Sequence, residues 1–168
     1  GLAAATWSDG ALTARQSAPP PPPVQRVAGA PAGEVIKAEF DQSKVYPGTW
    51  REYWVYVPSQ LDRTRPAPVM VFQDGLQYSA PIVFDNLIHA KAIPAMVGVF
   101  VMHGRVRAPS ADALDRMNRS FEYDSVSGEY ARFLLDELLP HVAKTHGLNL
   151  STDPNDRAIA GNSSGAIA

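Results

Sequence analysis

The chain has 168 residues, of which 45% are hydrophobic and 19% are charged, so it is long enough to form one globular core. A formal net charge of −2 provides no strongly basic surface, which argues against a nucleic-acid partner. Cysteine is absent, which excludes disulfides and thiolate metal sites, and no apolar run approaches the length of a membrane span, so no membrane partner is expected.

Residues 1–33 differ in composition from the rest of the chain. An Ala-rich start is followed by consecutive prolines from Pro19 to Pro23. Proline neither continues a helix nor donates to a strand ladder, so this segment is predicted to be an extended leader or linker; a Pro-rich interaction ligand is the alternative. The Ala-rich start is compatible with the remainder of an export signal, although no basic or apolar signal region is visible. A secreted or periplasmic location is therefore the expectation, with a cytoplasmic one as the alternative.

The folded domain is predicted to comprise residues 34–168 and to begin with two strands. Val35–Phe40 and Trp50–Val57 are rich in aromatic and β-branched residues, and the turn at Tyr46–Gly48 between them predicts an antiparallel hairpin. Val69–Phe72 is a continuous apolar run, which is typical of a strand covered on both faces.

A parallel crossover is predicted next. Val83–Lys91 is compatible with a helix, and Ala95–Met102 is another buried strand, so strand, helix and strand follow one another. The segment His103–Ser125 is long and polar, and a loop of that length in a compact domain is more often functional than idle.

A long helix is predicted after Ser127. Its apolar residues recur at helical spacing and should face the sheet; they are Tyr130, Phe133, Leu134, Leu138 and Val142. Pro140 should kink or divide this helix, and Gly147 should end it. Arg157–Ala160 then predicts a buried strand, and Ala166–Ala168 the opening of another helix. This order of elements predicts an α/β-hydrolase fold, a mostly parallel sheet with an N-terminal antiparallel hairpin, of which the chain contains the first half.

The last predicted strand leads into a G-x-S-x-G motif, Gly161-Asn-Ser-Ser-Gly165. In its catalytic form, this motif is a sharp strand-to-helix turn that exposes the central serine, here Ser163, as a nucleophile. The backbone N–H of the next residue, Ser164, then stabilises the oxyanion of the tetrahedral intermediate. A glycine-serine loop without function is the alternative, because the pattern also occurs by chance.

Blocks in the same order along residues 34–168 resemble the esterase D and enterochelin-esterase-like family, which includes feruloyl esterases and mycolyltransferases. The blocks are Arg51-Glu-Tyr-Trp-Val-Tyr-Val-Pro58, Pro68-Val-Met-Val-Phe-Gln-Asp-Gly75, Phe84-Asp-Asn-Leu-Ile88, Asn118-Arg-Ser-Phe-Glu-Tyr-Asp124, Tyr130-Ala-Arg-Phe-Leu-Leu-Asp-Glu137 and Arg157-Ala-Ile-Ala-Gly-Asn-Ser-Ser-Gly165. The resemblance implies acyl transfer through a covalent serine ester on Ser163, with no metal or cofactor. It also implies the Leu76 N–H as the second oxyanion donor.

The turn that contains Leu76 follows a strand, at the sheet edge where α/β proteins bind ligands. Asp74, Gly75 and Gln77 are therefore candidate substrate-binding residues, although Asp74 could instead hold its own turn. His103 is a fourth candidate, because relatives often have Asn-Pro-Gly where this chain has His103-Gly104. Among the arginines of the following segment, Arg119 could bind an anionic group or pair with a nearby carboxylate.

The resemblance implies that the acid and the histidine of the triad come from chain that follows the nucleophile, and the sequence ends at Ala168. We therefore expect a serine carboxylic-ester hydrolase, acting on a small-molecule or polysaccharide-linked ester, that is completed by a C-terminal half or a second chain. A catalytically inactive half-domain with a carbohydrate- or ester-binding role, and an interaction module acting through the Pro-rich leader, are the alternatives.

Overall fold

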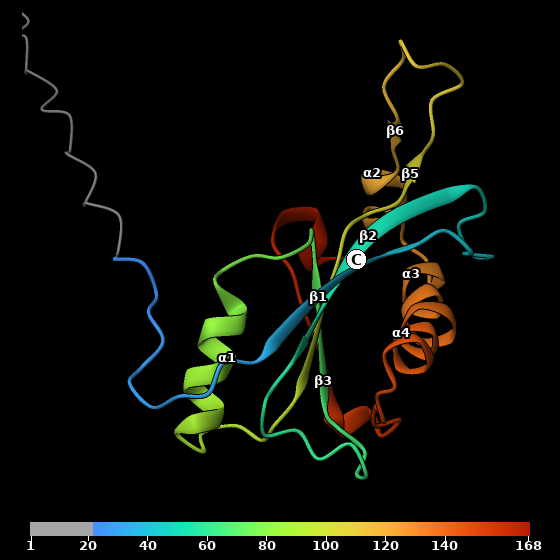
Figure 1. Cartoon of the computed structure of the whole chain (residues 1–168). Helices are drawn as coiled ribbons and strands as arrows, with labels where there is room; N and C mark the ends of the chain where they lie inside the picture. Colours follow the sequence, from blue (N-terminus) through green and yellow to red (C-terminus); the bar gives the residue numbers. More distant parts are fainter. Residues whose placement is uncertain (1–21) are drawn as a thin grey trace, which may run out of the picture.

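Figure 1 shows the computed structural model of the chain, which describes residues 22–168. Within these residues, seven strands form a mixed sheet in the order β6-β5-β2-β4-β3-β7, with β1 also paired to β2. The strands are β1 Glu34–Phe40, β2 Thr49–Val57, β3 Val69–Gln73, β4 Val97–Val101, β5 Arg105–Val106, β6 Arg116–Met117 and β7 Arg157–Ala160. The α-helices are α1 Ala80–His89, α2 Arg119–Tyr123, α3 Glu129–Arg132 and α4 Leu139–His146. The π-helix η1 is Phe133–Leu138, and the 3₁₀ turns are η2 Pro154–Asp156 and η3 Ser163–Ala166.

The predicted hairpin and parallel crossover are both confirmed. Strands β1 and β2 are antiparallel, with Glu34 opposite Val57 and Phe40 opposite Arg51. Strands β3 and β4 are parallel neighbours in the sheet, and α1 connects them. The chain between them thus has the βαβ arrangement that the apolar runs indicate.

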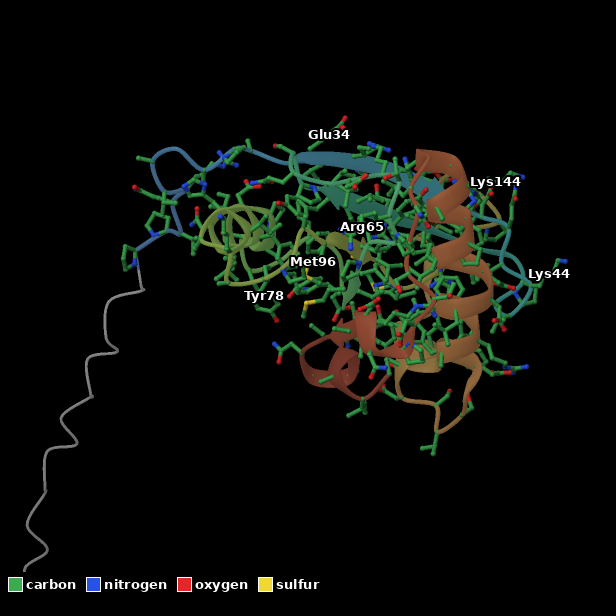
Figure 2. The ribbon with its side chains drawn as sticks, turned by 90° about the horizontal axis from the view of Figure 1, so that it is seen from below. Glu34, Lys44, Arg65, Tyr78, Met96 and Lys144 are labelled. Atoms are coloured by element: carbon green, nitrogen blue, oxygen red, sulfur yellow. The ribbon has the colours of Figure 1, made fainter. Side chains whose placement is uncertain are left out.

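Helices cover both faces of the sheet, as Figure 2 shows from below, with α1 on one side and the long helix on the other. Val69 and Val71 of β3 pack in the core under the long helix, whereas Phe72 packs in a second core against α1. Strand β3 is apolar on both faces because each face is buried against a helix. No helix within residues 22–168 is both long and apolar enough to cross a membrane.

The long helix is continuous through α3, η1 and α4, and its five predicted core residues are all buried. Pro140 lies in the first turn of α4, directly after the π-helical turn Phe133–Leu138. Proline has no N–H to donate to the preceding turn, which is a physical reason for the change of helix type at this point. Gly147 ends the helix in the left-handed conformation with φ of 60°, as predicted.

The segment His103–Ser125 is not an unstructured loop, contrary to the prediction. It forms the short antiparallel pair β5–β6, which projects as an arm beyond the sheet in Figure 1, and then helix α2. Glu122 fixes the base of this segment through an ion pair with Arg51 of β2, and both side chains are fully buried. Sequence composition alone does not reveal this partner, because it lies 71 residues away.

The prediction of a buried last strand is wrong for its middle residues. Strand β7 pairs with β3 but has no neighbour on its other side among the described residues, and Ile159 is 55% exposed. An apolar groove of about 210 Å³ runs beside it, lined by residues that include Val71, Tyr130, Leu134 and Ile159. An outer strand has one unpaired edge, so its side chains are covered less completely.

The segment that precedes β1 contacts helix α1. The buried carboxylate of Asp85 accepts hydrogen bonds from Arg26 at 2.9 Å, from the Gly33 N–H at 2.8 Å and from the Tyr56 hydroxyl at 2.8 Å. Burial of its ring, together with the hydrogen bond that it donates to Asp85, raises the pKa of Tyr56 well above its ordinary value. Residues 1–21, which include most of the proline run, lie outside the described residues, so the leader assignment stays a prediction.

Candidate active site

The turn at Gly161–Gly165 connects β7 to η3 and holds Ser163 in an uncommon backbone conformation. Asn162 is extended with φ of −133°, and Ser163 then adopts φ of 55° in the left-handed region. Non-glycine residues in this region store strain, which is typical of functional turns. The helix predicted to open at Ala166 is instead a single 3₁₀ turn that begins at Ser163.

Both glycines of the motif lie in closely packed surroundings. A Cβ atom at Gly161 would overlap the carbonyl oxygen of Gly165. A Cβ atom at Gly165 would lie 3.0 Å from the Asp74 Oδ2 atom and 3.1 Å from the Gln73 Cβ atom. The turn is therefore packed tightly on itself and against the loop that follows β3.

This packing leaves Ser163 exposed and Ser164 half-buried. Among residues 22–168, no hydrogen-bond acceptor contacts the backbone N–H of Ser164 or that of Leu76. Leu76 is 44% exposed in the neighbouring loop. Both predicted donors are thus free to bind an acceptor atom of another molecule.

The loop after β3 is also strained, and it is held by Arg119. Asp74 has φ of 62° and Gly75 has φ of 79°. The two carboxylate oxygens of Asp74 accept hydrogen bonds from the Nε and Nη2 atoms of Arg119, each at 2.7 Å. These hydrogen bonds raise the pKa of Arg119 above its ordinary value. Gln77 donates to the Asp74 carbonyl oxygen at 2.9 Å, so its amide also supports this loop.

His103 lies at the end of β4 and is 4% exposed. Its Nδ1 atom is 3.0 Å from the carbonyl oxygen of Gly104, whose own N–H donates to Glu122. A Cβ atom at Gly104 would overlap the Glu122 carboxylate, so this chain needs glycine here. A role for His103 in shaping the substrate pocket stays a prediction.

No histidine forms a hydrogen bond with Ser163 within residues 22–168. His141 and His146 belong to α4, where their rings pack against Tyr53, and the Tyr53 hydroxyl is 3.0 Å from His146 Nε2. Burial lowers the pKa of both histidines. These residues support the sheet on the face that α4 covers.

Three residues around the candidate site were not predicted in their observed roles. Arg119 pairs with Asp74 rather than with a carboxylate of its own segment. The Tyr123 hydroxyl lies 3.5 Å from the Asp74 N–H, and burial raises the pKa of Tyr123 to about 12. Gln73 is buried, and neither its Oε1 nor its Nε2 atom has a hydrogen-bond partner among the described residues. A polar residue at the end of an apolar strand is the only sequence signal for Gln73.

Residues 45–168 match the protein family described as "Putative esterase". The chain belongs to this family. A search of curated proteins found no match. Within residues 22–168, no group of three or more His, Cys, Asp or Glu side chains could hold a metal ion.

Solved structures similar to this esterase-family chain include a ferulic acid esterase from Anaeromyces mucronatus in complex with ferulic acid. That structure is 19% identical with a TM-score of 0.60, and the match covers 85% of this chain and 53% of the other. A mutant of the feruloyl esterase module from Clostridium thermocellum, complexed with sinapinate, is 13% identical with a TM-score of 0.56; the match covers 88% and 51%. An enterobactin and salmochelin hydrolase, IroE, is 19% identical with a TM-score of 0.51, with 81% and 55% covered.

The esterase-family chain thus spans about half the length of the solved relatives that it matches. The sheet order and the helical layers on both faces, together with these matches, confirm the predicted fold class. The chain has the first half of an α/β-hydrolase fold, with the serine motif directly after its last strand.

Proposed function

We propose that this chain carries the nucleophile and the oxyanion donors of a serine carboxylic-ester hydrolase. The observation that supports the proposal most directly is the left-handed backbone of the exposed Ser163, immediately after a parallel strand. A strained turn of this kind presents a serine hydroxyl above the edge of the sheet. Membership of the esterase family supports ester hydrolysis as the reaction class.

In the proposed reaction, the Ser163 hydroxyl loses its proton to a histidine while its oxygen attacks the carbonyl carbon of the ester. The carbonyl electron pair moves onto oxygen, and the N–H groups of Ser164 and Leu76 stabilise the resulting oxyanion. The tetrahedral intermediate then expels the alcohol, which takes the proton from the histidine and leaves an acyl-serine. Water attacks the acyl-serine in the same manner and releases the carboxylic acid.

The histidine and the acidic residue of this mechanism are proposed to come from chain beyond residue 168 or from a second polypeptide. No histidine within residues 22–168 forms a hydrogen bond with Ser163, and the match to the ferulic acid esterase covers only 53% of that chain. The unpaired edge of β7 and the apolar groove beside it give such a segment a surface on which to complete the sheet.

The proposed substrate is a small-molecule or polysaccharide-linked ester. A shallow hollow of about 330 Å³ beside the candidate oxyanion donor is lined by residues that include Leu76, Gln77 and Tyr78. Tyr78 and Leu76 are exposed, so an apolar or aromatic acyl group would find apolar contacts there. The ferulic acid and sinapinate complexes of the similar structures make hydroxycinnamoyl esters the first substrates to screen.

Intact mass spectrometry before and after treatment with a fluorophosphonate tests the proposal. The expected result is a single addition of the probe mass on Ser163, in a preparation that contains a longer chain or a second polypeptide. The control is Ser163→Ala, which should remain unlabelled. An unlabelled Ser163 in the wild-type protein would contradict the proposal and favour a binding role instead.

A further inference from the structure

The ion pair between Asp74 and Arg119 joins two segments that lie far apart in the sequence. Asp74 follows β3, and Arg119 is the first residue of α2, 45 positions later. The contact is bidentate, with both nitrogen-to-oxygen distances at 2.7 Å. Planar guanidinium and carboxylate groups in this arrangement fix each other's orientation as well as their separation.

The same carboxylate also packs against the serine turn. A Cβ atom at Gly165 would lie 3.0 Å from the Asp74 Oδ2 atom, the oxygen that accepts from Arg119 Nη2. Gly165 is buried and lies two residues after Ser163. Figure 1 places α2 and η3 at the same end of the sheet, where the two elements are in contact. Asp74 therefore lies at the junction of three segments.

The backbone at this junction depends on contacts from outside the turn as well as within it. Asp74 and Gly75 both have positive φ, and the Gln77 amide, which donates to the Asp74 carbonyl oxygen, is joined by contacts from β4 and α2. The Gly75 N–H donates to the Val101 carbonyl oxygen at 3.1 Å, and the carboxylate of Asp74 is held by Arg119. The next residue is Leu76, whose N–H is the proposed oxyanion donor.

We propose that Asp74 and Arg119 are positioning residues that hold the Leu76 N–H in register with the Ser163 turn. This inference rests on the proposed function. The pair acts through geometry, because the two hydrogen bonds from Arg119 fix the carboxylate of the residue two positions before Leu76. It also accounts for the small residue at position 165, since a Cβ atom there would lie 3.0 Å from the Asp74 Oδ2 atom.

A purely stabilising ion pair would behave differently. The two side chains are 19% and 31% exposed, so removing this pair should cost less folding free energy than removing the fully buried pair Arg51–Glu122. Misplacement of a catalytic group by about 1 Å, in contrast, costs on the order of a hundredfold in rate. The inference therefore predicts a large loss of rate with a small change in stability.

The test compares wild type with Asp74→Asn and Arg119→Lys in the complete protein, with the rest of its fold present. Arg119→Lys retains the charge but not the bidentate geometry. We expect kcat for 4-nitrophenyl acetate, and the rate of fluorophosphonate labelling, to fall about 10- to 100-fold in both variants, with KM within about twofold of wild type. The matched control is Glu129→Gln, which removes the exposed Glu129–Arg132 pair and should leave both rates unchanged.

Each possible result either supports or overturns the positioning role. Wild-type rates in Asp74→Asn and Arg119→Lys, with Ser163 labelled normally, would overturn the positioning role and leave the proposed function intact. A wild-type protein whose Ser163 is never labelled would overturn both. If the variants lose rate only in proportion to a lost folded fraction, measured by thermal unfolding, the pair is a stabilising contact and the positioning role is wrong.

Discussion

Glu122→Leu is predicted to be one of the most destabilising single substitutions in this chain. The Glu122 carboxylate accepts hydrogen bonds from Arg51 at 2.7 and 3.0 Å, from the Gly104 N–H at 3.1 Å and from Asn118 at 3.0 Å. The Arg51 guanidinium in turn stacks on the Phe133 ring at 4.1 Å and is fully buried. Removing the carboxylate leaves this cation without a counter-charge in the core.

We expect Glu122→Leu to lower the free energy of unfolding by about 3–5 kcal/mol, the usual cost of breaking a buried ion pair on one side. The double variant Arg51→Met with Glu122→Leu should recover part of this loss, because no charge remains buried. The Gly104 N–H and the Asn118 amide still lose their acceptor, which costs about 1–3 kcal/mol each when such a group stays unsatisfied. The double variant should therefore be less stable than wild type but more stable than Glu122→Leu.

Equilibrium urea unfolding followed by far-UV circular dichroism measures these differences, with Glu129→Gln as the exposed-pair control. The control should stay within about 1 kcal/mol of wild type. A loss below about 1 kcal/mol for Glu122→Leu, or a double variant less stable than the single one, would refute the view that Arg51 is held as a buried cation.

Three further predictions concern the serine turn, the strand end beneath it and the long helix. Gly161→Ala should reduce fluorophosphonate labelling of Ser163 on the order of a hundredfold, because the added methyl overlaps a backbone carbonyl; Gly128→Ala, where nothing lies within 4 Å, should label normally. Gln73→Met should raise the free energy of unfolding by about 1–3 kcal/mol in urea titrations, because it removes a buried amide that has no partner among the described residues. A variant less stable than wild type would show that the amide has a partner, such as a buried water. Burial lowers the pKa of His146 below its ordinary 6.5, so the unfolded chain binds the proton more readily and stability should fall as the pH drops below about 6.5. His146→Gln should flatten that slope between about pH 7 and pH 5, and an unchanged slope would exclude this histidine as its source.

The sequence by itself determined the order of the elements outside the segment His103–Ser125, and it located the G-x-S-x-G turn after the last strand. Continuous apolar runs such as Val69–Phe72 can be buried only between two layers, and the structure places helices on both faces of that strand. The helical spacing from Tyr130 to Val142 fixed the buried face of the long helix. The glycines at positions 161 and 165 marked a closely packed turn, and at Gly161 an added Cβ atom would overlap a backbone carbonyl oxygen. All these signals are local, so they are readable without the partners.

The tertiary structure alone decided which distant groups meet. Arg51 with Glu122, and Asp74 with Arg119, are separated by 71 and 45 residues, and each has other opposite charges nearer in the chain. Exposure of β7 likewise depends on a neighbouring strand rather than on its own apolar residues. Charge pairing and strand burial depend on which residues are neighbours in space. Composition and periodicity do not predict those neighbours.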